Sequence, residues 1–312
     1  MPREAKLEVE GLEKSYGSNK VLDNISFSVH GNEVFGLLGP NGAGKTTMIR
    51  IILEVLRQDA GKVRLLGSGN GRDDVRERIG YLPEEGSLYR DATVGEAIRY
   101  FASLKGCELD DNRLDKWLKR FGLSGHEGKQ ISELSKGMQR KVLFIIAVAH
   151  DPEILILDEP FSGLDPVNRR LVKDVIMDLK KRGMTIIMST HQMDEVERMC
   201  DRILMIHKGE RVLYGGLDTI KKGYGQSLFI DYKGRLPKMA GVDRKDDYGN
   251  HAELVLKKGA DTQEMMRKLA ASRTAEIMRF EVKTRSLSEI FIDVVEGDIP
   301  EDIKMSMRGA DV

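Results

Sequence analysis

Cysteine is scarce in this chain of 312 residues, which contains only Cys107 and Cys200 and has no Cys-x-x-Cys spacing. A disulfide framework or a cysteine-based metal site is therefore not expected, and a reducing compartment fits the composition. An excess of charge of either sign is also missing, because 50 Lys and Arg balance 50 Asp and Glu. Phosphate backbones attract basic proteins, so this balance argues against nucleic acid as a partner.

Long apolar runs are missing as well. The longest, VLFIIAVA at residues 142–149, is far shorter than the roughly 18–20 residues that span a bilayer. The first residues, MPREAKLEVEG, are charged and have no apolar core, so they do not read as a signal peptide. If the protein works at a membrane, a separate chain is expected to supply the membrane-spanning part.

What the sequence does contain is an alternation of β-like and helical segments in its first part. A helical pattern at 44–56 follows a glycine-rich turn, and helical patterns with little strand signal fill the segment from Thr93 to His150. Strand patterns occur at 6–12, 25–30, 33–39, 62–67 and 78–83. We therefore expect an α/β core that contains a helical lobe at about residues 90–150.

Apolar strands return after this helical segment. EILILDEP at 153–160 is apolar until its end, as expected for a strand buried on both faces of a parallel sheet. A helix at 166–183 and a second buried strand at 184–190 follow. The segment 201–216 is predicted to be a hairpin that turns at a Lys-Gly pair. These patterns indicate a mostly parallel sheet with an added antiparallel β section.

The pattern changes near residue 222, where strands and helices alternate in a new order. Strand, strand, helix, strand and helix patterns occur at 228–233, 252–259, 262–272, 278–284 and 286–297. We therefore predict a first domain at 1–222, a small α+β domain at 223–298 and a frayed tail at 299–312.

The glycine-rich turn, GPNGAGKTT at 39–47, fits the G-x-x-x-x-G-K-[ST] pattern of a phosphate-binding P-loop. Glycines let the backbone approach a phosphate closely and turn N–H groups inward, while the following helix directs its positive end at the same anion. Lys45 is predicted to contact the β- and γ-phosphates of ATP, and Thr46 is predicted to bind Mg²⁺. The candidate nucleotide-binding residues in this turn are Gly39, Asn41, Gly42, Gly44, Lys45, Thr46 and Thr47.

Two acids end the buried strand at 153–160. Asp158 lies at the carboxyl end, where α/β sheets place their ligands, and is predicted to hold Mg²⁺ through its water shell. Glu159 is the next residue and points differently, so it is predicted to orient and deprotonate an attacking water. Alone, such a pair is more often a surface feature, but beside a P-loop the catalytic interpretation is favoured.

With these residues the chain resembles the ATP-binding subunit of an ABC transporter, over about residues 5–220. The most specific further motif is Leu134-Ser135-Lys136-Gly137-Met138, which is similar to the family's signature sequence at the start of a helix. In the family this motif addresses the γ-phosphate held by the P-loop of the other subunit. The resemblance therefore implies that role for Ser135 and Gly137, on a P-loop NTPase core of the ABC type.

Three further matches occur in the family's order. Ser162-Gly163-Leu164-Asp165 resembles the loop that contacts the opposing active site, which implies a nucleotide-side role for Asp165. His191 resembles the switch histidine at the γ-phosphate, and Tyr16 resembles the aromatic residue on which adenine stacks. Each also has an ordinary structural interpretation: a capped turn, a strand-end histidine or a packed surface tyrosine.

Two features depart from the family pattern. Glu84 stands where the family usually has glutamine, and its carboxylate is predicted to bind Mg²⁺ or water. Lys136 and Met138 occupy the usual second glycine and glutamine places of the signature. Such variants, together with RSLSEIFIDVVEG at 285–297, resemble an exporter-like branch with a separate membrane subunit and an appended C-terminal domain.

The resemblance implies a cytoplasmic ATPase, peripheral on the inner face of the cell membrane, with a polytopic membrane subunit and a second ATPase subunit, most simply an identical chain. ATP would join two chains head to tail, and hydrolysis with Lys45, Glu159 and His191 would release them. The alternatives left open are a soluble ABC-type ATPase acting on ribosomes or DNA, and a P-loop switch or kinase without transport. A single cassette without a heptad run or basic tail disfavours the first, and the signature motif disfavours the second.

Overall fold

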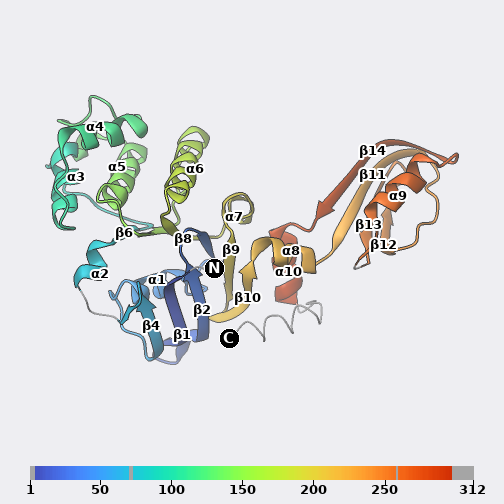
Figure 1. Cartoon of the computed structure of the whole chain (residues 1–312), viewed down its shortest axis with the longest axis horizontal. Helices are drawn as coiled ribbons and strands as arrows, with labels where there is room; N and C mark the ends of the chain where they lie inside the picture. Colours follow the sequence, from blue (N-terminus) through green and yellow to red (C-terminus); the bar gives the residue numbers. More distant parts are fainter. Residues whose placement is uncertain (1–3, 70–72, 258, 297–312) are drawn as a thin grey trace. The chain divides into compact units, whose positions relative to one another are not determined.

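The computed structural model describes residues 4–69, 73–257 and 259–296. The chain divides into an N-terminal unit, Met1–Tyr214, and a C-terminal unit, Gly215–Val312 (Figure 1). The second unit thus begins at Gly215 rather than at residue 223, because the helix Leu217–Gly223 belongs to it. The predicted tail at 299–312 lies outside the described residues.

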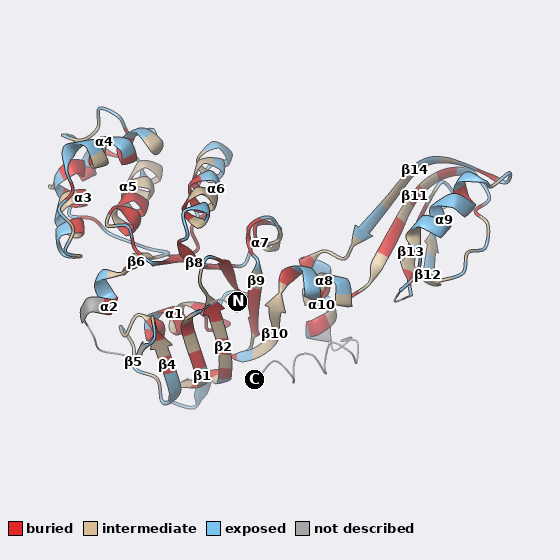
Figure 2. Ribbon diagram, in the orientation of Figure 1, coloured by how far each residue is buried: buried red, intermediate tan, exposed pale blue. Residues whose placement is uncertain are grey.

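A six-stranded sheet forms the centre of the N-terminal unit, in the order β10-β9-β3-β8-β7-β6. Its strands β3, β7 and β8 are buried at every residue, as expected from their largely apolar sequences. Figure 2 shows this burial for β8. The pairs of β3 with β8 and β9, and of β7 with β6 and β8, are parallel, as expected. The strands are β3 (Val34–Leu38), β6 (Ile79–Leu82), β7 (Ile154–Asp158), β8 (Thr185–Thr190), β9 (Arg202–His207) and β10 (Glu210–Gly216).

An antiparallel section accompanies this sheet. In it β1 pairs with β2 on one side and β4 on the other, in the order β2-β1-β4-β5. Its inward side chains, among them Leu7, Val9 and Phe27, share one core cluster with Phe35 and Ile49. The strands are β1 (Ala5–Tyr16), β2 (Asn19–His30), β4 (Ala60–Leu65) and β5 (Ser68–Gly69).

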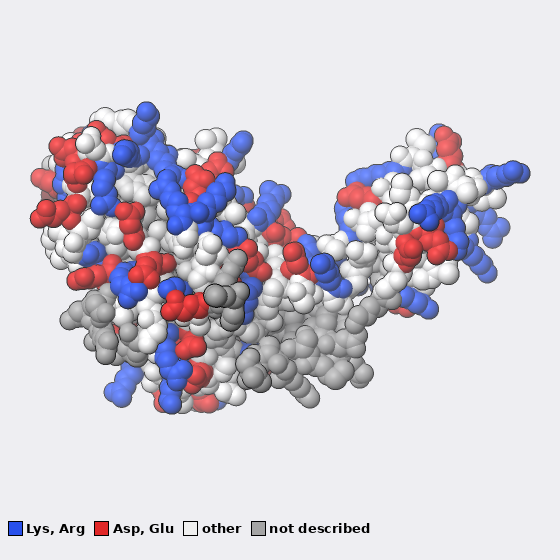
Figure 3. All heavy atoms as spheres, viewed as in Figure 1, with Lys and Arg blue, Asp and Glu red and all other residues white. Residues whose placement is uncertain are grey.

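The helical lobe predicted at about 90–150 is present as α3, α4 and α5. Each of these helices starts at a side chain that caps its first turn: Thr93, Asp110 and Ser135. Acidic and basic side chains are interspersed over the visible face of the lobe (Figure 3), and several are paired, such as Arg99 with Asp111. The helices of the unit are α1 (Lys45–Ile52), α2 (Asp73–Glu77), α3 (Val94–Ser103), α4 (Asp111–Arg120), α5 (Lys136–Val148), α6 (Pro166–Lys181), α7 (Met193–Met199) and the 3-10 turn η1 (Ile131–Glu133).

The described residues of the C-terminal unit form a four-stranded antiparallel sheet, in the order β12-β13-β11-β14, and the helices α8, α9 and α10. The apolar residues of its inner face, such as Ile230 and Leu254, share a core cluster with Met265 and Leu269 of α9. Strand β12 has the sequence VDRKDD and was not predicted, because its charges hide the β pattern. The elements are α8 (Leu217–Gly223), β11 (Gln226–Gly234), β12 (Val242–Asp247), β13 (His251–Leu256), α9 (Thr262–Ala270), β14 (Ala275–Thr284) and α10 (Leu287–Glu296).

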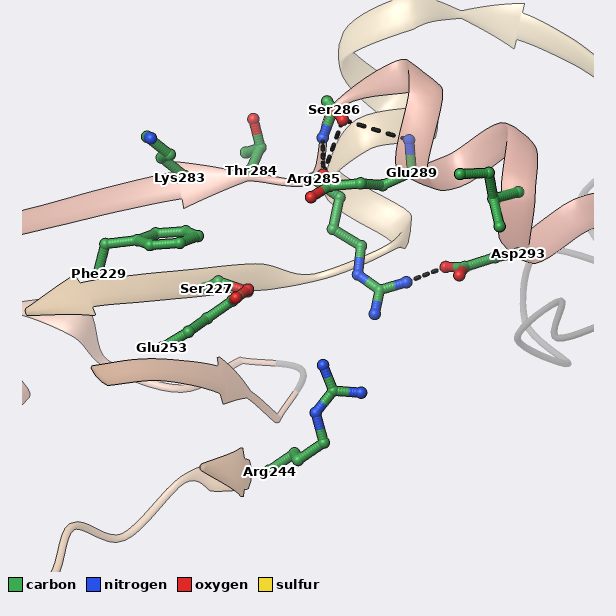
Figure 4. Close-up of a pocket in the computed structure, with 11 residues that line it drawn as sticks. Ser227, Phe229, Arg244, Glu253, Lys283, Thr284, Arg285, Ser286, Glu289 and Asp293 are labelled. Atoms are coloured by element: carbon green, nitrogen blue, oxygen red, sulfur yellow. Dashed lines mark hydrogen bonds and ion pairs between the residues drawn. The ribbon is translucent and has the colours of Figure 1, made fainter. Parts of the chain in front are cut away.

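The opposite face of this small sheet carries charged residues. A pocket of about 430 Å³ lies here and is lined from β11, β12, β13, β14 and α10 (Figure 4). Several of its charges have partners: Arg285 pairs with Asp293, and the Lys283 ammonium lies 4.7 Å from the centroid of the Phe229 ring. Within the described part of the chain, no helix is long and apolar enough to cross a bilayer.

Candidate nucleotide site

The P-loop connects β3 to α1, as predicted, and its glycines are there for geometry. Gly39 and Gly44 have φ of 152° and 105°. A Cβ atom at Gly39 would lie 2.3 Å from the carbonyl oxygen of Ile206, and one at Gly44 would lie 2.8 Å from that of Val21. Gly42 has φ 80° but open space around it. Glycine is therefore required at positions 39 and 44 because other backbone atoms approach closely, and at position 42 because of its positive φ.

Lys45 opens α1 and turns back over the loop. Its ammonium donates to the carbonyl oxygens of Gly39, at 2.7 Å, and Pro40, at 3.2 Å. Burial lowers the pKa of Lys45, and the nearby carboxylates of Glu159, Asp158 and Glu84 oppose that shift. Because the first turn of α1 contains no acidic residue, its N–H groups and this ammonium can present positive charge to an anion.

Asp158 ends β7 and is 1% exposed. Its Oδ1 accepts a hydrogen bond from the hydroxyl of Ser189 on the adjacent strand β8, which fixes the carboxylate. Its Oδ2 is buried and has no hydrogen-bond partner among the described residues. A buried carboxylate oxygen without a partner is costly unless a cation or its bound water satisfies it. The residue therefore fits the predicted Mg²⁺ role, with Thr46 in the neighbouring pocket wall as the second group.

Glu159 adopts φ 46°, a left-handed conformation that is rare for glutamate. Its backbone N–H donates to the carbonyl oxygen of Ser189 at 3.1 Å, and this hydrogen bond stabilises the turn. One carboxylate oxygen lies 2.8 Å from Nδ1 of His191, and the other accepts from the Thr190 hydroxyl at 3.3 Å. The side chain is therefore held at both carboxylate oxygens, and its role as the base that orients water stays a prediction.

A pocket of about 310 Å³ collects part of the predicted site. It is lined by Val21, Asn41, Gly42, Gly44, Lys45, Thr46, Thr47, Glu84 and Glu159. His191 reaches this group through Glu159. Tyr16, which is 50% exposed, and the signature segment 134–138 are not among the described residues that line it.

The remaining candidates lie at helix starts. Ser135 caps α5 by accepting from the N–H of Met138 at 3.3 Å, and Gly137 lies in the first turn. Asp165 caps α6, where the N–H of Asn168 lowers the pKa of its carboxyl. Ser135 and Asp165 thus have a structural role within this chain as helix caps. The first turns of α5 and α6 are exposed and accessible to a second chain.

Sequence reasoning missed three groups that organise the site. Ser189 and Thr190 hold the two carboxylates from β8, and their signal was a pair of hydroxyls ending an otherwise apolar strand. Arg140 of α5 donates to backbone carbonyl oxygens beside Glu84 and Glu159. Backbone acceptors leave no trace in the sequence, so nothing could have predicted these contacts of Arg140.

The P-loop, the acidic strand end and the sheet order define a P-loop ATP-binding protein with a helical lobe. Residues 22–162 match the ABC transporter family, and residues 215–295 match the ATP-binding protein DrrA1-3-like C-terminal domain. An ABC transporter ATP-binding protein of Methanocaldococcus jannaschii is 42% identical over 290 residues, covering 92% of this chain and 98% of that protein. The chain belongs to the family of ABC transporter ATP-binding proteins, whose nucleotide domains bind ATP.

Other relatives and solved structures agree. The Nod factor export ATP-binding protein I of Paraburkholderia xenovorans is 40% identical over 216 residues, covering 68% of this chain and 71% of that protein. A solved ATP-binding subunit of an ABC transporter has a TM-score of 0.65 and 33% identity, covering 69% of this chain and 92% of its own. CbiO1 of Clostridium perfringens, part of the transporter complex CbiONQ, has a TM-score of 0.61 and 28% identity, covering 69% and 90%.

Proposed function

We propose that this chain hydrolyses ATP as one half of a head-to-tail pair of identical subunits. The pair acts on the inner face of the cell membrane and drives export through a separate polytopic membrane subunit. The observation that carries the proposal is a divided site. Lys45 and Glu159 line one pocket, while no described residue of the signature segment 134–138 lines it. A second chain is the natural source of the missing signature.

The residues of this chain suit hydrolysis at that pocket. Lys45 and the N-terminus of α1 neutralise the phosphates, and Asp158 with Thr46 would hold Mg²⁺, which neutralises phosphate charge when bound. Glu159 orients the attacking water and accepts its proton. Thr190 and His191 keep its carboxylate in position for this role. His191 is half-exposed beside this carboxylate and can extend to the γ-phosphate.

Exposed aromatic side chains beside the Glu84 loop support docking of a membrane subunit. Tyr89 is 67% exposed and Tyr100 is 50% exposed, and their rings meet edge to face with centroids 6.4 Å apart. Leu104, 58% exposed, follows one turn further along the same helical segment. Exposed apolar groups that gather on a surface mark protein contacts. The export direction is supported by the relative named for Nod factor export.

A mixing experiment tests the divided site. Lys45→Ala subunits keep the signature but lose the P-loop, and Ser135→Arg subunits keep the P-loop but lose the signature. Each variant alone is expected to be inactive. An equal mixture is expected to regain about a quarter of wild-type ATP turnover, because about half of the pairs are mixed and each mixed pair has one complete site out of two. A mixture no more active than its components contradicts head-to-tail pairing.

A pull-down tests the partner. Tagged Glu159→Gln protein, loaded with ATP and Mg²⁺ and gently solubilised from native membranes, is expected to carry a stoichiometric polytopic membrane protein. The matched control combines Tyr89→Ala with Tyr100→Ala, which should lose that companion while still binding ATP. Ribosomal or DNA-repair proteins in place of a membrane chain would instead support the ATPase that acts on ribosomes or DNA.

A further inference from the structure

Arg140 occupies an unusual place between the signature helix and the catalytic acids. It lies in α5, five residues after Ser135, the residue that caps this helix and heads the signature. The neighbouring Gln139 donates to the carbonyl oxygens of Ile131, at 3.1 Å, and Leu134, at 3.0 Å. The segment before Ser135 is thereby tied to the helix, so the signature and the first turns of α5 form one connected element.

The guanidinium of Arg140 bridges two chain segments through four hydrogen bonds. One nitrogen donates to the carbonyl oxygens of Pro83, at 2.5 Å, and Glu84, at 2.6 Å. The other donates to those of Asp158, at 3.1 Å, and Glu159, at 2.9 Å. A planar guanidinium can serve two carbonyl pairs at once, whereas the single ammonium of a lysine cannot hold both.

These four carbonyl oxygens belong to residues just beyond the end of the ladder between β6 and β7. The parallel ladder between β6 and β7 stops at the pair Leu82 and Leu157, and the two chains then continue to the site. Arg140 therefore takes over from the ladder and sets the spacing between the Glu84 loop and the turn that carries Glu159. Burial lowers the pKa of Arg140, with Asp158 and Glu84 opposing the shift, and the group remains charged as a guanidinium does.

We propose that Arg140 is a positioning residue that couples the signature helix to the catalytic acids of its own chain. The inference rests on the proposed function, in which Ser135 of one subunit completes the site of the other. A shift of α5 on contact with the partner's nucleotide moves the backbone beside Glu84 and Glu159 through the Arg140 bridge. Nucleotide binding at one site of the pair thereby changes the position of the catalytic acids at the other site. The change passes through hydrogen bonds to backbone carbonyl oxygens rather than to side chains.

The test separates nucleotide binding from turnover in the purified full-length chain, with MgATP as the probe. Arg140→Lys keeps the charge but loses one carbonyl pair. It is expected to leave the KM for MgATP within about threefold and to lower kcat by about 10- to 100-fold, as for a misplaced catalytic group. Arg140→Met should lower kcat at least as much, so lysine does not rescue.

Arg113→Lys is the matched control, since Arg113 bridges the other end of α5. Its guanidinium donates to the carbonyl oxygen of Ala149, at 2.9 Å, and to the Asp151 carboxylate, at 2.6 Å. This variant removes a comparable bridge in the same lobe and should keep wild-type kcat. Equal losses of kcat in the Arg113 and Arg140 variants would reduce the effect to general loosening of the lobe and overturn the proposal.

Two further outcomes keep the inference separate from the proposed function. If Arg140→Met fails to fold, the Lys variant decides, because its unfolding midpoint can be compared directly with that of Arg113→Lys. Wild-type kcat in a folded Arg140→Lys protein would overturn the coupling while the mixing experiment still succeeds. Failure of that mixing experiment, with wild-type protein active alone, would instead remove the head-to-tail pair on which the coupling rests.

Discussion

The two units of the chain differ in whether they bury charged side chains. Among the described residues, the buried charged side chains all lie in the N-terminal unit: Glu33, Lys45, Asp158, Glu159 and Glu195. In the C-terminal unit the buried polar residue is Ser227, and the charges stand on the open face of the sheet, as Arg244 and Lys283 do in Figure 4. Both units have apolar cores, so the difference is not one of folding in general.

The buried charged side chains lower stability, so their presence in the N-terminal unit indicates that this unit contains the functional site. Burying a charge is unfavourable, so a buried charge that persists is either paired or used. Lys45 and Glu159 line one pocket, and Asp158, the residue before Glu159, keeps a buried carboxylate oxygen that has no hydrogen-bond partner among the described residues. Exposed ion pairs, by contrast, contribute little because water and salt screen them. Equivalent substitutions should therefore have unequal effects in the two units.

The largest difference is expected between two aspartates. Asp158→Asn should lower ATP turnover by at least about 100-fold, because it weakens the buried oxygen that fits Mg²⁺. Asp231→Asn changes a carboxylate that contacts His251, at 2.5 Å, on the open face of the C-terminal sheet, and should leave turnover within about twofold. Steady-state ATPase assays measure both. Equal losses would show that the open face also serves catalysis.

Two glycines with positive φ give the next contrast. Gly39→Ala should lower the free energy of unfolding by about 3 kcal/mol, because the new Cβ overlaps a backbone oxygen. Gly249 has φ 89° but nothing within 4 Å of an added Cβ. Gly249→Ala should therefore cost only about 1 kcal/mol, from conformation alone. Denaturant unfolding measures both values, and equal costs would refute the close-approach argument.

Substitution of the buried Lys45 is expected not to destabilise the nucleotide-free protein, unlike most substitutions of buried residues. Lys45→Met should abolish stabilisation by MgATP without lowering the stability of the nucleotide-free protein, because a buried ammonium is removed. The pKa of Lys45 in the fold lies below 10.5, its ordinary value. Between the lowered pKa of the folded state and 10.5, the unfolded chain therefore binds more protons than the folded protein. The stability of the wild-type protein rises with pH across this range.

The measurement for Lys45 is the free energy of unfolding at neutral and at alkaline pH, with and without MgATP. The methionine variant should lack the part of the alkaline gain that comes from Lys45. Lys283→Met is the control, since this lysine is half-exposed on the other unit, and it should change stability by less than about 0.5 kcal/mol at both pH values. A nucleotide-free Lys45→Met protein markedly less stable than wild type would contradict the expectation.

The smallest effect is expected at Asp247 in the C-terminal unit. Hydrogen bonds from Lys245, Tyr232 and the Gly249 N–H lower the pKa of Asp247 to about 2. Its stabilising contribution is present above pH 3.8, its ordinary pKa, and is lost as the pH falls toward about 2. Because the group is partly exposed, Asp247→Asn should cost less than about 1 kcal/mol near neutral pH. Acid titration of unfolding in wild type and variant checks this window.

The contrast also shows how far the sequence could lead. The P-loop, the acidic strand end and the helical lobe were predictable, because turn chemistry and apolar runs are local signals. Strand β12 was missed, because VDRKDD carries no alternation of apolar and polar residues. It is a strand because its backbone pairs with β13, and Arg244 and Asp246 remain in solvent.

By itself the sequence determined the local motifs of the nucleotide site: the P-loop turn between a strand and a helix, and the two acids that follow the buried strand. Only the tertiary structure decided how these groups are held. Ser189 and Thr190 reach the acids from the neighbouring strand β8, and Arg140 reaches across from the signature helix. Local motifs are fixed by neighbours along the chain, whereas these contacts depend on strand order and on backbone oxygens, which every residue possesses alike.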